Sequence, residues 1–94
     1  MTEVTAVIPA YNEGTRIETV LQETTPYVDE ILIVDDHSTD NTTTRARPYG
    51  RVIQHDTNRG YNATLKTGFA AASTDIIVTL DADGEHDPAD IPRL

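Results

Sequence analysis

The chain lacks cysteine and is poor in basic residues, and both deficits exclude classes of function. Without cysteine there can be no disulfides and no cysteine-based zinc site. Seven Lys and Arg residues stand against sixteen Asp and Glu residues, so the formal net charge is −9. This charge opposes binding to a nucleic-acid backbone or to anionic lipid. We therefore expect no nucleic-acid partner.

Long hydrophobic runs and glycine-rich phosphate loops are also missing. No apolar stretch approaches the roughly 20 residues that a membrane helix needs, so we expect no transmembrane segment in this chain. Neither a P-loop nor a G-x-G-x-x-G sequence is present, so phosphate groups would have to be bound by other means. The apolar residues, 37% of the chain, are regularly patterned, which argues against disorder.

Four short runs rich in β-branched residues have the length and the flanking turn residues of strands. These runs are residues 4–8, 31–34, 51–55 and 76–80. The second and the fourth are almost continuously apolar, which is typical of strands covered on both faces. We therefore predict four strands, with the second and fourth fully buried.

Segments with helical periodicity lie between these strands. In the first, Thr15 and Glu18 have the spacing of a capping box. The apolar face of this helix is expected to contain Ile17, Val20, Leu21 and Thr24. A weaker helical signal covers residues 40–47, with Ser38 or Asp40 available as a cap. The apolar stripe of the last helix is expected to contain Tyr61, Leu65, Phe69 and Ala72.

The alternation of strands and helices predicts an α/β fold. Right-handed crossovers would give three layers, a parallel sheet with helices on both faces. Asp87 and Pro88 are typical of a helix start shortly before the end at Leu94. We therefore interpret residues 1–94 as a single unit of a longer protein, truncated at its C-terminal end.

Polar side chains gather after each predicted strand, in residues 9–13, 35–40, 56–60 and 81–85. The loops that precede the strands contain fewer carboxylates. In a parallel sheet the carboxyl ends of the strands share one edge, and open α/β folds bind ligands there. The asymmetry predicts a functional site at that edge.

Asp81 and Asp83 are the most informative of these residues. On an extended backbone their Cα atoms would lie about 6.6 Å apart with both side chains on the same side. Such carboxylates repel each other unless a proton or a cation lies between them. Mg²⁺ or Mn²⁺ would satisfy both and could also bind a diphosphate; alternatively, one carboxylate could accept hydrogen bonds from a ribose.

Other polar residues at this edge leave alternatives open. Asp35 and Asp36 could accept hydrogen bonds from a base or a ribose, while Glu13 could bind a ligand or only start a helix. The three histidines, His37, His55 and His86, lack metal-ligand spacing and are expected to be loop or surface residues.

Four motifs, in residues 7–13, 34–42, 58–62 and 81–88, together resemble family 2 glycosyltransferases. The similarity is closest to the dolichyl- or polyprenyl-phosphate mannosyl- and glucosyltransferases. It implies that residues 1–94 are the nucleotide-sugar-binding part of the enzyme, the N-terminal half of a GT-A (Rossmann-like) fold. Three positions depart from the family: Glu85 replaces a frequent Gln, while His37 and Asn62 stand where relatives often have Gly.

The resemblance also assigns roles to individual residues. The expected nucleotide-binding residues are Pro9, Ala10, Tyr11, Glu13, Asp35, Asp36, Gly60, Lys66 and Asp81. The expected ligands of the Mg²⁺ or Mn²⁺ ion are Asp81, Asp83 and Glu85. Any catalytic base is expected beyond Leu94.

The function implied by the resemblance is that of an inverting, metal-dependent hexosyltransferase. The donor would be GDP-mannose, UDP-glucose or UDP-N-acetylglucosamine, and the acceptor a polyprenyl or dolichyl phosphate or a saccharide. We expect this chain alone to bind the donor without turnover. The expected location is cytoplasmic, where the full-length protein could lie peripherally on the membrane.

Two other functions fit parts of the pattern. A receiver-type, Mg²⁺-binding signalling domain would explain an acidic pair after a strand, but here the pair follows the second strand. A sugar-phosphate nucleotidyltransferase would need a Gly-rich basic loop after the first strand, and residues 9–14 do not provide it.

Overall fold

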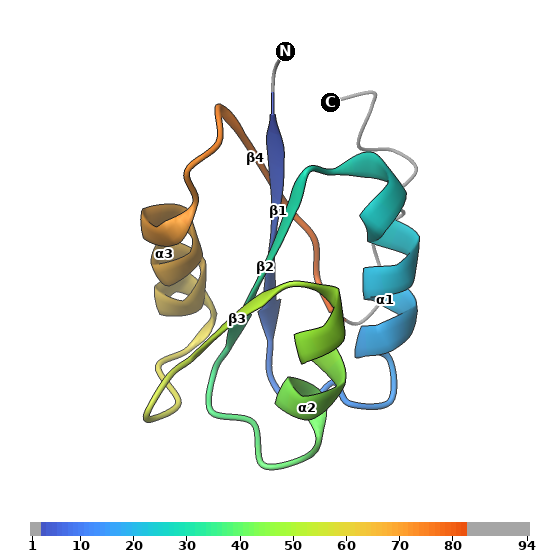
Figure 1. Ribbon diagram of the computed structural model, residues 1–94. Coiled ribbons are helices and arrows are strands. Elements are labelled where there is room, and N and C mark those ends of the chain that lie inside the picture. The colour runs from blue at the N-terminus through green and yellow to red at the C-terminus, as the bar shows by residue number, and fades with distance from the viewer. Residues whose placement is uncertain (1–2, 83–94) are drawn as a thin grey trace.

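A parallel four-stranded sheet forms the middle layer of the protein in a computed structural model that describes residues 3–82 (Figure 1). The strands are β1 (Val4–Ala10), β2 (Glu30–Asp35), β3 (Arg51–Gln54) and β4 (Ile76–Thr79). Their order across the sheet is β3-β2-β1-β4, and every neighbouring pair is parallel. The predicted strands and their parallel arrangement are therefore confirmed.

Helices cover both faces of this sheet. The helices are α1 (Ile17–Thr24), α2 (Thr42–Ala46) and α3 (Tyr61–Ala71). Figure 1 shows α1 and α2 on one face and α3 on the other. Short 3₁₀ turns over Thr25–Tyr27 and Arg47–Tyr49 follow α1 and α2. The predicted three-layer α/β fold is confirmed.

The core has two parts because successive side chains of a strand point to opposite faces. On the first face, Ala6 and Ile8 of β1 belong to the same buried cluster as Ile17 and Leu21 of α1. On the other face, Val7 clusters with Leu32 and Val34 of β2, and the end of α3 packs against them. β1 and β2 are therefore buried on both sides.

β4 differs from the prediction that it would be covered on both faces. Ile76 and Ile77 are 43% and 36% exposed, and Val78 is the only buried residue of this strand. In the described part of the sheet β4 lies at an edge and pairs with β1 alone. Its edge position, which the apolar run does not encode, explains the exposure.

The start of α1 also differs from the prediction. The helix begins at Ile17 without a side-chain cap, so Thr15 and Glu18 do not form a capping box. Instead, the carbonyl oxygen of Glu13 accepts hydrogen bonds from the N–H groups of Arg16 and Ile17. The predicted apolar face of the helix is confirmed, because its four residues are all buried.

The face of α3 that meets the sheet is not the predicted aromatic stripe. Tyr61 and Phe69 are 55% and 45% exposed, whereas Thr64 and Gly68 are buried against the sheet. A Cβ atom on Gly68 would lie 2.3 Å from Cγ1 of Val7, so the helix backbone approaches β1 too closely for larger residues. Small residues therefore form the contact.

This close approach predicts how the chain responds to substitution at two adjacent positions, Gly68 and Phe69. Gly68→Ala should lower the free energy of unfolding, because overpacking costs about 1–3 kcal/mol against a helix-propensity gain of about 1 kcal/mol. Phe69→Ala should cost less than the roughly 3–5 kcal/mol of a buried aromatic residue. Urea unfolding of both variants measures these costs; a Gly68→Ala chain more stable than the parent chain, or a loss of about 3 kcal/mol or more in Phe69→Ala, would contradict the prediction.

Candidate functional site

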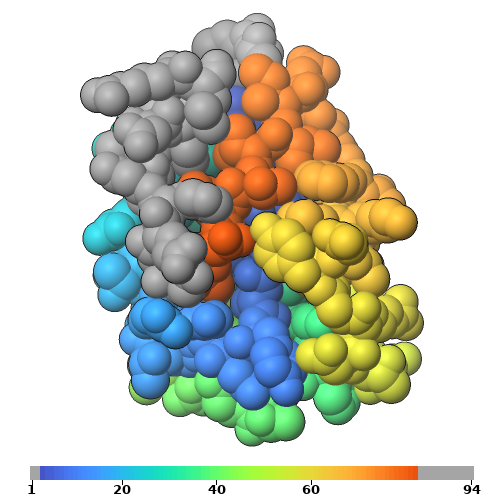
Figure 2. All heavy atoms as spheres, turned by 180° about the vertical axis from the view of Figure 1, so that it is seen from behind, coloured from blue at the N-terminus to red at the C-terminus, as the bar shows by residue number. Residues whose placement is uncertain are grey.

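The carboxyl ends of all four strands surround one cavity of about 530 Å³. Its walls are formed by Pro9, Ala10, Tyr11, Glu13, Asp36, Asn58, Gly60, Tyr61, Thr64, Asp81 and Ala82. Figure 2 shows the segment after β1 (blue), the start of α3 (yellow) and the end of β4 (orange-red) side by side on one face. The prediction that the polar loops meet at one edge is confirmed.

The structure brings together most, though not all, of the predicted nucleotide-binding residues. Seven of them line the cavity: Pro9, Ala10, Tyr11, Glu13, Asp36, Gly60 and Asp81. Asp35 and Lys66 are not among the lining residues, and Lys66 is exposed on α3. Asp83 and Glu85 lie outside the described residues.

Several lining residues were not predicted individually. Asn58 belongs to the polar loop after β3, whereas Tyr61 and Thr64 lie in the first turn of α3. The helical periodicity predicts Tyr61 in the apolar stripe of its helix instead. The spacing of Tyr61 and Thr64, three residues apart just after Gly60, was the available signal, because such residues share a helix face.

Asp36 organises the loop that follows β3. Asp36 is 5% exposed, and its carboxylate accepts hydrogen bonds from the N–H of Arg59 (2.8 Å) and of Gly60 (2.9 Å). The ring Nδ1 of His55, 2.8 Å away, donates a third. Asn58 Nδ2 donates to the Asp36 carbonyl oxygen at 3.2 Å. His55 lies in the loop after β3, as one of the two predicted alternatives has it, but it is buried and therefore not a surface residue.

Two opposing effects set the pKa of the Asp36 carboxyl. Burial raises the pKa, but the hydrogen bonds from Arg59, His55 and Gly60 outweigh that effect, and the pKa lies below the ordinary value of 3.8. Asp36 is therefore a stabilised, ionised carboxylate in the wall of the cavity.

Asp35 serves its own loop instead. Its side chain is fully buried and accepts hydrogen bonds from the backbone N–H (2.9 Å) and the hydroxyl (2.6 Å) of Ser38. Adjacent residues at a strand end point in opposite directions, so only Asp36 of this pair faces the cavity. The structure thus separates the two carboxylates that the sequence left equivalent.

The loops after β1 and β2 are tied together by side chains. The N–H of Asn12 donates to Ser38 Oγ at 2.9 Å, and Asn12 Oδ1 accepts from the N–H of Thr39 at 2.8 Å. Asp40 accepts hydrogen bonds from the N–H of Gly14 and from the hydroxyl of Thr42. The bond from the Thr42 hydroxyl is the main reason that the pKa of Asp40 is also lowered.

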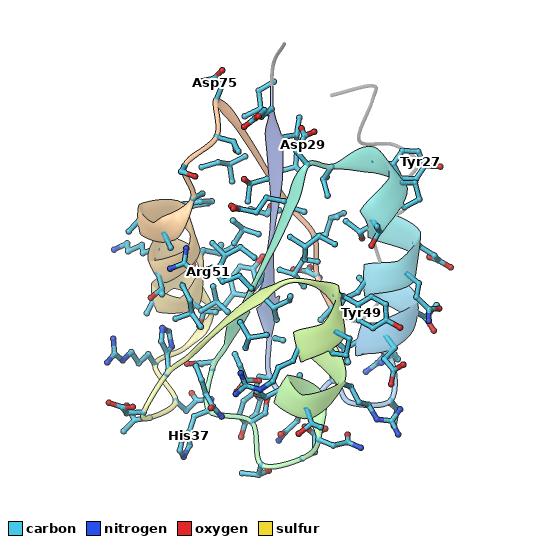
Figure 3. All side chains as sticks on the ribbon, in the orientation of Figure 1. Tyr27, Asp29, His37, Tyr49, Arg51 and Asp75 are labelled. Atoms are coloured by element: carbon cyan, nitrogen blue, oxygen red, sulfur yellow. The ribbon has the colours of Figure 1, made fainter. Side chains whose placement is uncertain are left out.

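Two non-glycine residues in these loops have left-handed backbone angles. The φ of Asn12 is 54° and that of His37 is 66°, a conformation that costs most L-residues energy. His37 Nδ1 donates to the carbonyl oxygen of His55 at 3.3 Å, which ties the strained loop to the end of β3. In Figure 3 the labelled His37 lies at this edge, opposite Asp29 and Asp75.

Glu13 and Asp81 are acidic residues in the lining of the cavity. Glu13 Oε2 is buried without a hydrogen-bond donor, although Arg16 Nε lies 3.1 Å away. Arg16 is therefore the charge partner of Oε2, although the pair lacks hydrogen-bond geometry. Asp81 Oδ1 accepts a hydrogen bond from the Tyr61 hydroxyl at 3.1 Å.

The oxygen ligands at this edge suit a hard cation such as Mg²⁺ or Mn²⁺. Of the predicted metal ligands, Asp81 lies within the described residues and lines the cavity. Across residues 3–82 no three His, Cys, Asp or Glu side chains gather as a metal site. Of the three predicted ligands, the described part therefore contains Asp81 alone.

The helices give no sign of a membrane span. Within residues 3–82, none of them combines the length and the apolar character that crossing a bilayer requires.

Comparison with known proteins places the chain among glycosyltransferases. Residues 5–94 match the family model of glycosyl transferase family 2. An uncharacterized glycosyltransferase from Mycobacterium tuberculosis is 37% identical over 97% of this chain and 41% of its own length. An undecaprenyl-phosphate 4-deoxy-4-formamido-L-arabinose transferase from Serratia proteamaculans is 38% identical over 98% of this chain and 32% of its own length.

Solved structures agree with this result. Glucosyl-3-phosphoglycerate synthase from Mycobacterium tuberculosis, in complex with Mn²⁺, UDP and glucosyl-3-phosphoglycerate, superposes with a TM-score of 0.85. The two sequences are 32% identical, and the match covers 97% of this chain and 37% of that one. The chain thus spans well under half the length of the relatives it matches, and its fold corresponds to the N-terminal part of their GT-A fold.

The lowered pKa of Asp36 predicts a loss of stability in acid. The pKa of Asp36 in the folded chain lies below its unfolded-state value of 3.8. The stabilisation that ionised Asp36 gives the fold is therefore fully present when the pH is above the unfolded-state pKa. It is lost as the pH falls through the folded-state pKa. Asp36→Asn should therefore destabilise the chain near neutral pH, by about 1–3 kcal/mol, and should be less sensitive to acid than the parent chain.

Urea unfolding near neutral pH and at about pH 3 tests this linkage. Asp75→Asn removes an exposed carboxylate from the opposite edge of the sheet and controls for net charge (Figure 3). An equal acid sensitivity in the Asp36→Asn variant and the parent chain would show that Asp36 does not contribute.

Proposed function

Because the chain belongs to glycosyl transferase family 2, we propose that it forms the donor-binding part of an inverting, metal-dependent hexosyltransferase. The observation that carries this proposal is the cavity at the carboxyl ends of the four strands. Glu13, Asp36 and Asp81 place three carboxylates, from three different loops, in its walls. A nucleotide sugar carries hydroxyl and N–H groups that can donate hydrogen bonds to such carboxylates. Its diphosphate can share a bound cation with them.

The proposed nucleotide is uridine diphosphate rather than guanosine diphosphate. An ionised carboxylate has about four acceptor positions, and Asp36 already uses three of them for His55, Arg59 and Gly60. One position remains, which suits the single N–H of uracil. Guanine presents two adjacent N–H donors, for which one position is insufficient. Crystals of the M. tuberculosis synthase hold UDP-glucose together with Mn²⁺, which supports the same choice.

The remaining groups of the donor can be assigned to the other carboxylates. Glu13, which lines the cavity, would accept a hydrogen bond from a ribose hydroxyl through its carboxylate. Asp81, together with Asp83 and Glu85 beyond the described residues, would hold Mg²⁺ or Mn²⁺ near the diphosphate. When bound, the cation neutralises charge that develops on the leaving nucleotide.

A polyprenyl phosphate is the proposed acceptor. Relatives of this chain transfer a sugar to undecaprenyl phosphate, as their names state. An oxygen of the acceptor phosphate would attack the anomeric carbon opposite the UDP. The new C–O bond forms as the bond to UDP breaks, and UDP leaves with the electron pair. The attacking oxygen is already anionic, so no base is required, whereas a sugar hydroxyl would need one.

A titration of this chain tests the donor assignment. UDP should bind more tightly than GDP, and Mn²⁺ should strengthen UDP binding by about tenfold, or about 1.4 kcal/mol. Asp81→Asn and Asp83→Ala should each abolish most of the gain from Mn²⁺, because each removes a proposed ligand of the ion. Calorimetry with and without Mn²⁺ measures these changes.

Asp75→Asn is the matched control, because it removes the same charge from the opposite edge of the sheet (Figure 3). Its Mn²⁺ dependence should equal that of the parent chain. Tighter binding of GDP would overturn the base assignment, and an undiminished Mn²⁺ effect in Asp81→Asn would overturn the metal assignment.

A further inference from the structure

A buried histidine connects three elements behind the wall of the cavity. His55 follows β3 and is only 5% exposed. Its Nδ1 donates to Asp36 Oδ1 at 2.8 Å, and its Nε2 lies 2.8 Å from the hydroxyl oxygen of Thr67 on α3. The imidazole does not line the cavity, so any effect on a ligand must pass through its neighbours.

The neighbour that reaches the cavity is the loop over residues 58–60. Arg59 and Gly60 each donate a backbone N–H to the Asp36 carboxylate, one to each oxygen. Gly60 has a φ of +93°, lies at the N-cap position of α3 and lines the cavity. The orientation of the Asp36 carboxylate therefore fixes where this loop stands.

His55 in turn fixes that carboxylate. Asp36 Oδ1 accepts from both His55 Nδ1 and the Arg59 N–H. Without the ring, a buried carboxylate would lose one of its three donors and the contact that prevents its rotation. A buried, ionised carboxylate with fewer hydrogen-bond donors is costly in free energy. The loop of residues 58–60 would therefore move so that the carboxylate finds other donors.

The hydrogen bonds of the Thr67 hydroxyl are compatible with either a neutral or a cationic His55 ring, and the bond from Nδ1 to Asp36 is kept in both. The Thr67 hydroxyl has one proton and two neighbours, the carbonyl oxygen of Ala63 at 3.1 Å and His55 Nε2. If the Thr67 hydroxyl donates to the Ala63 carbonyl oxygen, Nε2 must donate a proton of its own to the Thr67 oxygen. The ring is then protonated on both nitrogens and is a cation. If the proton goes to Nε2, the ring is neutral. In both cases Nδ1–H donates to Asp36.

We propose that His55 is a positioning residue of the donor site, which anchors Asp36 to α3 and so sets the loop of residues 58–60 before the nucleotide arrives. The inference rests on the proposed function for the identity of the ligand. The position of the loop can be tested without any ligand. Preorganisation of this kind strengthens binding by removing the cost of ordering the loop.

Two substitutions of the same chemical type separate positioning from simple loss of packing. In His55→Asn the amide nitrogen takes the place of Nδ1 and can still donate to Asp36. In His55→Gln the amide nitrogen takes the place of Nε2, so Asp36 loses the donor from position 55 and keeps only Arg59 and Gly60. Thr67→Val keeps the ring but removes its contact on α3, and it remains informative should the Gln variant fail to fold.

The first readout is amide hydrogen exchange at Arg59 and Gly60. We expect exchange to be about tenfold faster in His55→Gln, nearly unchanged in His55→Asn and intermediate in Thr67→Val. The amide of Ile33 in the core of β2 reports on global unfolding and should stay the same in all variants. An equal rise at Ile33 would mean that His55 acts on stability alone, which would overturn the proposal.

The second readout is the Kd for UDP in the presence of Mn²⁺. The Kd should rise about tenfold in His55→Gln and stay close to that of the parent chain in His55→Asn. Full UDP affinity and full protection at Arg59 and Gly60 in the Gln variant would refute the positioning role. If the parent chain does not bind UDP, the proposed function fails, while the exchange rates still decide whether His55 positions the loop.

Discussion

The edge of the sheet that surrounds the cavity depends on one buried anion, the carboxylate of Asp36. Hydrogen bonds to an ionised carboxylate are stronger than those between neutral groups, and they are most valuable where water is excluded. Three such bonds join the end of β2 to the segment after β3 and to the start of α3. A single side chain thereby aligns three of the structural elements that surround the cavity.

The rest of the edge is held by bonds between neighbouring loops. The segment after β1 and the segment after β2 exchange hydrogen bonds through Asn12, Ser38 and Asp40. Left-handed backbone at Asn12 and His37 persists because these bonds determine the loop shape. Rigid loops of this kind suit a site whose task is to orient a flexible, charged ligand.

The layers and the ligand edge could be predicted from sequence, because both follow from local patterns. Strand-length apolar runs alternate with helical segments, and polar residues follow each run. The buried face of α3 could not be predicted, since it depends on how closely Gly68 approaches Val7, a tertiary distance that no periodicity encodes. The burial of His55 could not be predicted for the same reason, because its partner Asp36 follows another strand, nineteen residues earlier in the chain. The separate tasks of Asp35 and Asp36 likewise emerge only from the direction in which each side chain leaves β2.

The strand order has a thermodynamic consequence. β1 and β4 are neighbours although they stand at opposite ends of the described chain, so the walls of the cavity extend from Pro9 to Ala82. No shorter stretch encloses the space, and the cavity exists only once the whole sheet has assembled. A ligand that binds there binds only the folded chain and not the unfolded one. By mass action, its binding raises the free energy of unfolding of the entire sheet. Occupancy and structural integrity are, in this architecture, a single coupled equilibrium.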